Sequence, residues 1–168
     1  MVVTAWIDAD DLDVFNRLRA RLFPGELNYL SAHVTLFHHI PAADRQDFIA
    51  TACASAEELP SLTARVGQPY NLGKGVAYPI ECQELSDLRR KLRAKYLTSL
   101  STQDRVENKR FHLTVQNKVS HDEARRTLAQ LAEGEVPDTI GLRGISCYRY
   151  DGGPWTLLRH CPFGADRR

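Results

Sequence analysis

Two short segments of the chain repeat the same alternation of polar and apolar residues. Residues 33–36 (His-Val-Thr-Leu) and 112–115 (His-Leu-Thr-Val) both read His, apolar, Thr, apolar, and their histidines stand 79 positions apart. Side chains alternate between the two faces of a β-strand, so each histidine shares a face with its threonine while the apolar residues share the other. Each segment therefore predicts a strand with one face in a hydrophobic core and an imidazole and a hydroxyl opposite.

The residues that follow the two motifs also correspond. The same four residue types follow both motif histidines at the same sequence offsets: an apolar residue, an acid and two further apolar residues. After the first copy they are Ile40, Asp44, Ile49 and Ala52, and after the second they are Val119, Glu123, Leu128 and Leu131. Both motif strands are thus followed by a helix with the same buried positions. Because solenoid repeats are shorter and more numerous, two copies indicate the two halves of one pseudo-symmetric domain.

The rest of the chain alternates between predicted strands and helices. Turn residues and apolar spacing predict strands at about 2–7, 33–40, 62–66, 111–119, 142–150 and 155–161, with a glycine-punctuated hairpin over 70–78. They predict helices from the acidic turn at 8–11 to Pro24, from Pro41 to Pro60, over 84–100, and from a Ser-x-x-Glu capping box at 120–123 to about 132. This order is typical of an α+β fold with mainly antiparallel sheets.

Basic residues fall largely opposite the apolar stripes of two predicted helices. In the first helix these are Arg17, Arg19 and Arg21, and in the third they are Arg89, Arg90, Lys91, Arg93 and Lys95. A solvated face is the simplest interpretation of the group in the third helix. If those charges bind an RNA chain instead, they must border the cleft between the two motif strands.

Composition and charge exclude several classes of protein. The chain has 168 residues, 43% hydrophobic and 26% charged, which allows a hydrophobic core and argues against disorder. A net charge of +1 gives no global case for a nucleic-acid coat or a membrane surface. The N-terminal segment lacks a charged leader region, and no apolar run approaches the roughly 20 residues of a spanning helix.

Four scattered cysteines without a Cys-x-x-Cys pair suit buried, reduced thiols in a cytoplasmic protein: Cys53, Cys82, Cys147 and Cys161.

Two imidazoles and two hydroxyls lining one cleft suit acid–base chemistry. An unperturbed imidazole has a pKa near ~6.5, so at neutral pH one histidine can be neutral and its partner protonated. One can then take a proton from an attacking water or hydroxyl while the other protonates the leaving oxygen, as phosphodiester cleavage requires. The hydroxyls of Thr35 and Thr114 can donate to the non-bridging phosphate oxygens.

A metal site is the alternative use of the histidines. The available residues are His33, His38, His39 and His112. Neighbouring residues of a strand point to opposite faces, neither motif contains an acid, and the cysteines are remote, so we expect no metal and no other cofactor. His38, His121 and His160 are interpreted as surface or structural residues.

The paired His-x-Thr-x motifs, with apolar residues at both x positions, resemble those of the 2H phosphoesterase superfamily, which includes 2′-5′ RNA ligase-like proteins and cyclic phosphodiesterases. The carried-over residues are His33, Thr35, His112 and Thr114. Many relatives have proline before a motif histidine, where this chain has Ala32 and Phe111. That departure leaves the chemistry intact and does not favour any one subfamily.

The resemblance implies a fold and an activity. The fold is a pseudo-symmetric bilobal domain over residues 1–168, in which two mainly antiparallel sheets flank a central cleft and the helices lie outside. Each lobe presents one motif strand to the cleft. The activity is metal-independent opening of 2′,3′-cyclic phosphates to leave a 2′-phosphate, with His112 as the base that activates water and His33 as the acid.

Strand alternation adds candidates for substrate contact. Phe37 shares the face of the first motif and suits either stacking on a base or core packing. Gln116 and Lys118 share the face of the second, and Lys118 suits either a phosphate contact or a solvated position. Lys74, between two glycines, and Tyr148 are further candidates.

The sequence therefore predicts a monomeric phosphodiesterase acting on RNA cyclic-phosphate ends or small cyclic nucleotides. Three alternatives remain open. One is another 2H reaction, such as 2′-5′ linkage ligation or cleavage, or hydrolysis of a cyclic phosphate on an ADP-ribose derivative. The others are a non-catalytic nucleotide- or RNA-binding module and a structural domain with two accidental motifs.

Overall fold

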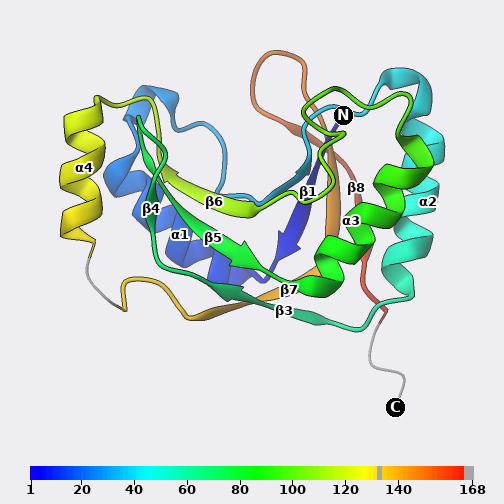
Figure 1. Ribbon diagram of the computed structural model, residues 1–168, viewed down its shortest axis with the longest axis horizontal. Helices are drawn as coiled ribbons and strands as arrows, with labels where there is room; N and C mark the ends of the chain where they lie inside the picture. The colour runs from blue at the N-terminus through cyan, green and yellow to red at the C-terminus, as the bar shows by residue number, and fades with distance from the viewer. Residues whose placement is uncertain (132–133, 165–168) are drawn as a thin grey trace.

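A computed structural model describes residues 1–131 and 134–164 of the chain (Figure 1). Within these residues the elements are β1 (Val2–Ile7), α1 (Ala9–Leu22), β2 (Thr35–Phe37), α2 (Arg45–Glu57), β3 (Leu62–Val66), β4 (Tyr70–Asn71), β5 (Val76–Glu81), α3 (Gln83–Tyr96), β6 (Phe111–Gln116), α4 (His121–Gln130), β7 (Thr139–Arg149) and β8 (Thr156–Pro162), with 3₁₀ turns η1 (Gly25–Leu27) and η2 (Ala42–Asp44). The expected elements are present, although β2, β6 and α3 end earlier than predicted. The predicted helix end near residue 132 and the tail at 166–168 lie outside the described residues.

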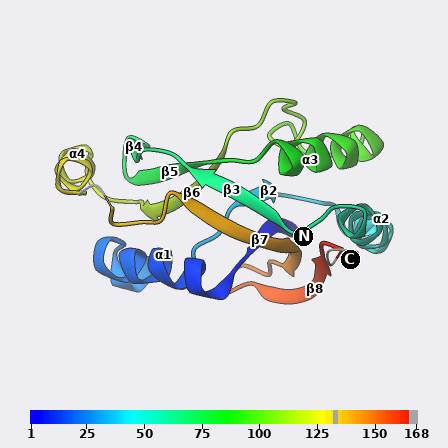
Figure 2. The same ribbon diagram turned by 90° about the horizontal axis from the view of Figure 1, so that it is seen from below.

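All strand pairings among the described residues are antiparallel, which confirms the predicted α+β class. The strands form one sheet in the order β2-β1-β7-β3-β5-β4, with β8 added to β7 and β6 added to β5. A bridge between Val34, just before β2, and Leu113 in β6 joins the two motif segments. The sheet thus nearly closes on itself and brings together strands that lie far apart in the chain (Figures 1 and 2).

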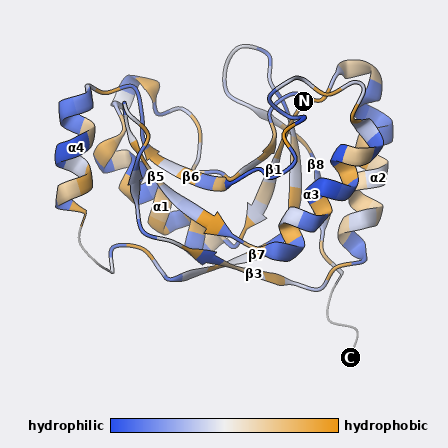
Figure 3. Cartoon of the chain, in the orientation of Figure 1, coloured by the Kyte–Doolittle hydropathy of each residue, from blue (hydrophilic) through white to orange (hydrophobic). Residues whose placement is uncertain are grey.

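The helices lie outside the strands, α1 and α4 at one end and α2 and α3 at the other (Figure 1). A helical turn begins nine positions after each motif histidine, at Ala42 for the 3₁₀ turn η2, which leads into α2 at Arg45, and at His121 for α4. Ser120 caps α4 by accepting a hydrogen bond from the backbone N–H of Glu123 at 3.1 Å, as the capping box predicted. Figure 3 shows that α3 and α4 carry both hydrophilic and hydrophobic residues. None of the helices in the described part of the chain is long and apolar enough to cross a membrane.

The apolar faces of both motif strands form the centre of the core. Val34, Leu36, Leu113 and Val115 are all 0% exposed and belong to one continuous cluster of buried side chains. At about 25 cal/mol per Å² of buried apolar surface, each contributes roughly 1.5–3 kcal/mol to folding. The predicted division of each motif into a core face and a polar face is therefore confirmed on its core side.

The prediction that all four cysteines are reduced thiols is wrong for two of them. Cys53 of α2 and Cys161 of β8 form a disulfide across a sequence separation of 108 residues, because α2 packs against β8. Cys82 and Cys147 are free and buried. The cysteine pattern consequently no longer supports a reducing, cytoplasmic environment.

Candidate active site

The bridge between the motif segments sets the register of the four polar motif residues. Because Val34 pairs antiparallel with Leu113, His33 lies across from Thr114, and Thr35 lies across from His112. Directly opposite residues of such a pair have Cβ atoms roughly 4.5–5.5 Å apart. The two apolar bridge partners are 0% exposed, so their four polar neighbours occupy the opposite face and are all partly exposed. The fold therefore collects the predicted catalytic set in one place.

One motif histidine is anchored to the backbone by a hydrogen bond. Nδ1 of His33 lies 2.8 Å from the carbonyl oxygen of Ser31, two positions earlier in the chain. A carbonyl can only accept, so Nδ1 of His33 carries a proton and the other ring nitrogen remains free to exchange one.

Burial lowers the pKa of both motif histidines below the ordinary value. For His33, the hydrogen bond to Ser31 works against this shift, and the charges of Arg19 and His112 add to it. For His112, the charge of Lys109 reinforces the effect of burial. The neutral form is therefore favoured at both positions in the free protein.

Each motif strand also receives a buried arginine from the helix that precedes the other motif. Arg19 of α1 donates from Nη1 to the carbonyl oxygen of Thr114 at 2.8 Å, and Arg89 of α3 donates from Nε to that of Leu36 at 3.0 Å. They are 4% and 1% exposed. The two halves therefore brace each other's motif strands through charge-assisted hydrogen bonds.

The expectations that the arginines of the first helix lie mostly opposite its apolar stripe and that Arg89 lies on a solvated face are wrong for Arg19 and for Arg89. Arg19 follows buried Phe15 by four positions, and Arg89 follows buried Leu85 by four, so both lie on the apolar side of their helices. Their burial is tolerated because backbone carbonyls accept from the guanidinium groups. The i+4 spacing is the sequence signal that would have identified them.

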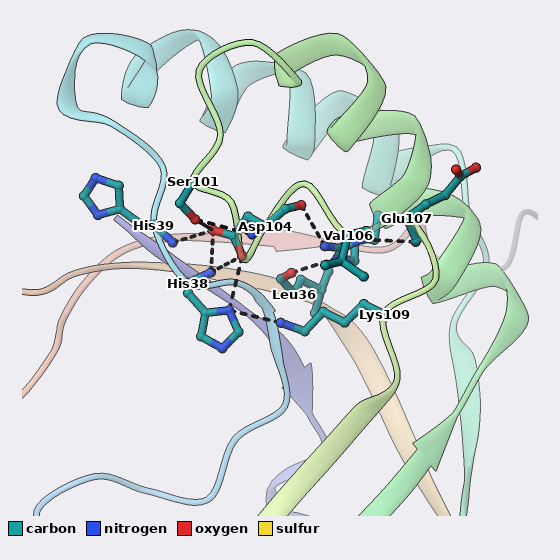
Figure 4. A network of polar contacts seen from close by, with 9 residues as sticks. Leu36, His38, His39, Ser101, Asp104, Val106, Glu107 and Lys109 are labelled. Atoms are coloured by element: carbon teal, nitrogen blue, oxygen red, sulfur yellow. Dashed lines mark hydrogen bonds and ion pairs between the residues drawn. The ribbon is translucent and has the colours of Figure 1, made fainter.

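A carboxylate organises the segment after β2 (Figure 4). Asp104 is 0% exposed and accepts from the backbone N–H groups of His38, at 2.9 and 3.0 Å, and His39, at 2.8 Å. Burial alone would raise the pKa of Asp104, but hydrogen bonds from His38 and His39 outweigh it and lower the pKa to about 2. Nδ1 of His38 also lies 3.1 Å from Nζ of Lys109, whose pKa burial and the charge of Arg89 lower to about 8.

Two of the residues predicted to contact substrate lie in the protein interior instead. Phe37 is 0% exposed and packs edge-on against Phe48 of α2 with ring centroids 5.4 Å apart. Gln116 is 1% exposed and donates to the hydroxyl of Thr127 in α4 at 2.9 Å. Neither side chain is accessible to a substrate, so both predictions are corrected.

A β-bulge after each motif threonine explains both corrections. Thr35 pairs with Thr4 and Phe37 with Val3, which leaves Leu36 as an extra residue in β2. The pairing of β6 with β5 likewise leaves Val115 as an extra residue between Thr114 and Gln116. A bulge interrupts the two-residue alternation, so the face assigned by parity ends at the motif threonines.

The remaining predicted contacts lie in two places: Lys118 and Lys74 are in neighbouring turns, joined by a hydrogen bond from the N–H of Val119 to the carbonyl oxygen of Lys74 at 3.1 Å, and Tyr148 lies near His33. Lys118 is exposed, with a positive φ of 61°, in the turn after β6, and Lys74 is exposed in the turn before β5. Tyr148 of β7 lines a cavity of about 640 Å³ that also includes His33. Among residues 1–131 and 134–164, no group of three or more His, Cys, Asp or Glu side chains is placed to hold a metal ion.

A nearly closed antiparallel sheet with outer helices and two facing His-x-Thr strands defines a 2H phosphoesterase fold. The family model of the 2′-5′ RNA ligase superfamily matches residues 7–154, and the chain belongs to that superfamily. None of the curated proteins compared with the chain matches it.

Solved structures share this fold at low sequence identity. TT0787 of Thermus thermophilus superposes with a TM-score of 0.66 at 13% identity, covering 99% of this chain and 100% of that one. E. coli LigT complexed with 3′-AMP gives a TM-score of 0.60 at 12% identity, covering 97% and 96%. A structure described as a phosphoesterase gives 0.59 at 14% identity, covering 97% of each chain. At these identities the likeness concerns the fold.

Proposed function

We propose that the chain is a metal-independent phosphodiesterase that opens 2′,3′-cyclic phosphates of RNA ends or nucleotides. The observation that carries the proposal is the bridge between Val34 and Leu113, which sets two histidine–threonine pairs side by side within one chain. A monomer therefore contains the whole candidate site. The superfamily and the shared fold with LigT, whose structures hold 3′-AMP, ATP or NADP⁺, support a nucleotide-like substrate.

In the proposed reaction the two histidines move protons on opposite sides of phosphorus. By analogy with the superfamily, His112 takes a proton from water as the water oxygen forms its bond to phosphorus. The bond between phosphorus and O3′ breaks, and His33 gives its proton to that oxygen. The products are a 2′-phosphate and a 3′-hydroxyl. Proton exchange with solvent then restores both imidazoles.

The substrate's charge fits this division of roles. A phosphodiester anion near both imidazoles favours protonation, opposing the depression of their pKa values by burial. It thereby favours the state in which one imidazole is protonated and the other is neutral, so that the two histidines provide both an acid and a base. The hydroxyls of Thr35 and Thr114 lie across from the histidines and donate to the non-bridging oxygens, where negative charge develops.

The test is turnover of a 2′,3′-cyclic nucleotide and of a cyclic-phosphate-ended oligoribonucleotide in EDTA. Loss of an acid or base lowers the rate by about 10²- to 10⁴-fold, so His33→Ala and His112→Ala should each lower kcat by that factor. His121→Ala, an exposed residue of α4, is the control and should leave kcat unchanged. Absence of turnover, or full activity in both motif variants, contradicts the proposal.

The same assay separates the alternatives. A 2′-5′ dinucleotide and a cyclic phosphate on an ADP-ribose derivative are offered in parallel, because the same histidine pair serves those reactions. A faster rate on either would assign the activity there. Tight nucleotide binding with no turnover of any substrate would identify a binding module.

A further inference from the structure

The two motif segments remain side by side beyond the paired motif residues. Their bridge puts Thr35 across from His112. His38 comes three positions after that threonine and Lys109 three positions before that histidine, and Nδ1 of His38 lies 3.1 Å from Nζ of Lys109. Three residues of extended chain span at most roughly 10 Å, and lysine has a flexible four-carbon stem. The charge of Lys109 acts on His112, so an ammonium group lies near that end of the candidate site.

Lys109 forms no ion pair with a carboxylate in the described part of the chain. It is partly buried, and its side-chain contact there is with His38. Asp104, next to His38, is 0% exposed, and both of its oxygens accept from backbone N–H groups. Arg89 also faces Asp104, so two positive charges surround one negative charge. One positive charge therefore remains unbalanced near His112, which favours the binding of an anion.

The surface next to Lys109 is also basic. Lys109 and the exposed Arg110 line a cavity of about 730 Å³, together with Pro79, the residue that pairs with His112. Glu81 is the only acid among the described residues that line this cavity, and it is paired with an arginine at 3.6 Å. An anion that approaches His112 from this side therefore meets positive charge.

Nδ1 of His38 lies between an acceptor and a donor (Figure 4). It is 3.2 Å from Oδ1 of Asp104, which can only accept, and 3.1 Å from the ammonium of Lys109, which can only donate. Because both oxygens of Asp104 already accept from backbone N–H groups, the carboxylate does not require the ring proton. Nδ1 can thus accept from Lys109 with the ring proton on Nε2. The ammonium then has two further N–H groups for a ligand.

We propose that Lys109 is a cationic group of the candidate active site outside the two motifs, and that it donates a hydrogen bond to the phosphate held between His33 and His112. His38 and Asp104 are positioning residues, because they hold the ammonium at the cleft. The inference rests on the proposed function and extends it with a donor placed where negative charge develops as water attacks phosphorus. The ammonium also distinguishes the two halves, since a positive charge near His112 favours the neutral imidazole that a base requires.

Sulfate binding tests Lys109 without turnover, because sulfate is a tetrahedral oxyanion whose charge is constant at neutral and alkaline pH. Lys109→Met removes the charge and keeps an unbranched stem. Since hydrogen bonds to charged groups are strong, calorimetry should show a rise in the Kd of sulfate of about tenfold or more. Lys109→Arg should retain most of the affinity. Lys91→Met is the control: this exposed lysine of α3 pairs with Glu58 at 2.8 Å, and its loss should leave the Kd unchanged.

Two results of the calorimetry contradict the proposal. One is equal sulfate affinity in the unmodified protein and Lys109→Met. The other is a loss in Lys109→Arg as large as that in Lys109→Met, which would assign the effect to packing rather than charge.

The pH profile of sulfate binding separates a bound ammonium from a structural lysine. The groups that face Lys109 are His38, Asp104, Arg89, Arg110 and the motif histidines. Burial and the charge of Arg89 lower the pKa of Lys109 to about 8, burial lowers the pKa of both motif histidines, and the pKa of Asp104 is about 2. Sulfate affinity should therefore decrease between about pH 7 and 9, as the ammonium loses its proton. The decrease should be absent in Lys109→Arg, and a flat profile in the unmodified protein would refute the contact.

The role of His38 is tested through Lys109. His38→Ala removes the acceptor and should weaken sulfate binding about threefold, whereas His38→Asn offers an amide oxygen near the position of Nδ1 and should restore it. Combined with Lys109→Met, His38→Ala should cause no further loss, because it acts through the ammonium. Additive losses would show that His38 binds the anion itself and would overturn its assignment as a positioning residue.

Kinetics separate this inference from the proposed function. If no cyclic phosphate is hydrolysed but sulfate affinity depends on Lys109 as described, the proposed function fails and the anion contact stands. If a 2′,3′-cyclic nucleotide is hydrolysed with the same kcat and KM by Lys109→Met and the unmodified protein, the inference fails and the proposed function stands. Both are supported if Lys109→Met lowers kcat about tenfold or more, and kcat/KM decreases above about pH 8 in the unmodified protein but not in Lys109→Arg.

Discussion

The substitution Arg89→Met tests whether a buried guanidinium holds the first motif strand in place. Arg89 donates to four backbone carbonyl oxygens, those of Leu36 at 3.0 Å, Asp104 at 2.9 Å, Val106 at 2.7 Å and Glu107 at 3.4 Å. Methionine keeps an apolar stem of similar length and removes every donor, so the interior carbonyls lose their partners. Each orphaned group destabilises by about 1–3 kcal/mol, whereas removing a buried cation recovers its desolvation. The net loss expected is about 3–5 kcal/mol.

Urea unfolding of the two proteins measures this difference. The loss is a large part of the roughly 5–15 kcal/mol by which domains of this kind are stable, so the midpoint should fall steeply. Arg90→Met is the matched control: Arg90 is exposed, its ion pair is with Asp87 of the same helix, and the change expected is within about 0.5 kcal/mol. A loss below about 1 kcal/mol for Arg89→Met would show that the buried hydrogen bonds do not stabilise the strand.

Three further predictions concern stability. Thiol titration of the unfolded, unreduced protein should count two free thiols, and a count of four would disprove the bond between Cys53 and Cys161. Cys53→Ser should lower the free energy of unfolding by about 2–5 kcal/mol. Gly75→Ala should destabilise the protein by about 3 kcal/mol, since the added Cβ would lie 2.0 Å from the carbonyl oxygen of Gln116. Gly153→Ala is the control, because a Cβ there meets no atom within 4 Å. Equal effects of the two substitutions on the urea midpoint would be inconsistent with this packing. Because burial lowers the pKa of both motif histidines, the unfolded chain binds more protons below about pH 6.5, and stability should decrease there as the pH falls. Replacing both histidines with glutamine should flatten that slope, and an unchanged slope would contradict the shifts.

Local patterns predicted the elements well. Residues 62–66 were predicted as a strand and form β3, and the capping box at Ser120 begins α4. Period-two alternation correctly separated buried Val34 and Leu113 from their polar neighbours. These successes share a cause. The preference of a segment for a helix or a strand, and for burying one of its faces, is set by residues that are close together in the sequence.

Errors arose where distant segments overrode the local pattern. The bulges that bury Phe37 and Gln116 arise from the pairing of β2 with β1 and of β6 with β5, and neither motif carries a glycine that would signal them. Arg89 looked like a solvated residue because its carbonyl partners lie in the segment after α3 and in β2. The cavity beside His33 combines residues from β1, α1, β7, β8 and two loops, and no single stretch reveals it.

The sequence by itself determined the polar set of the candidate site, because the duplicated His-x-Thr strand puts an imidazole and a hydroxyl on one face wherever the strand forms. It also determined the α+β class and the two-fold repeat. Only the tertiary structure decided that the two copies meet through the Val34–Leu113 bridge and that an aromatic cavity opens on the His33 side. Side-chain alternation is local to a strand, whereas register between strands 79 residues apart depends on how the whole sheet closes.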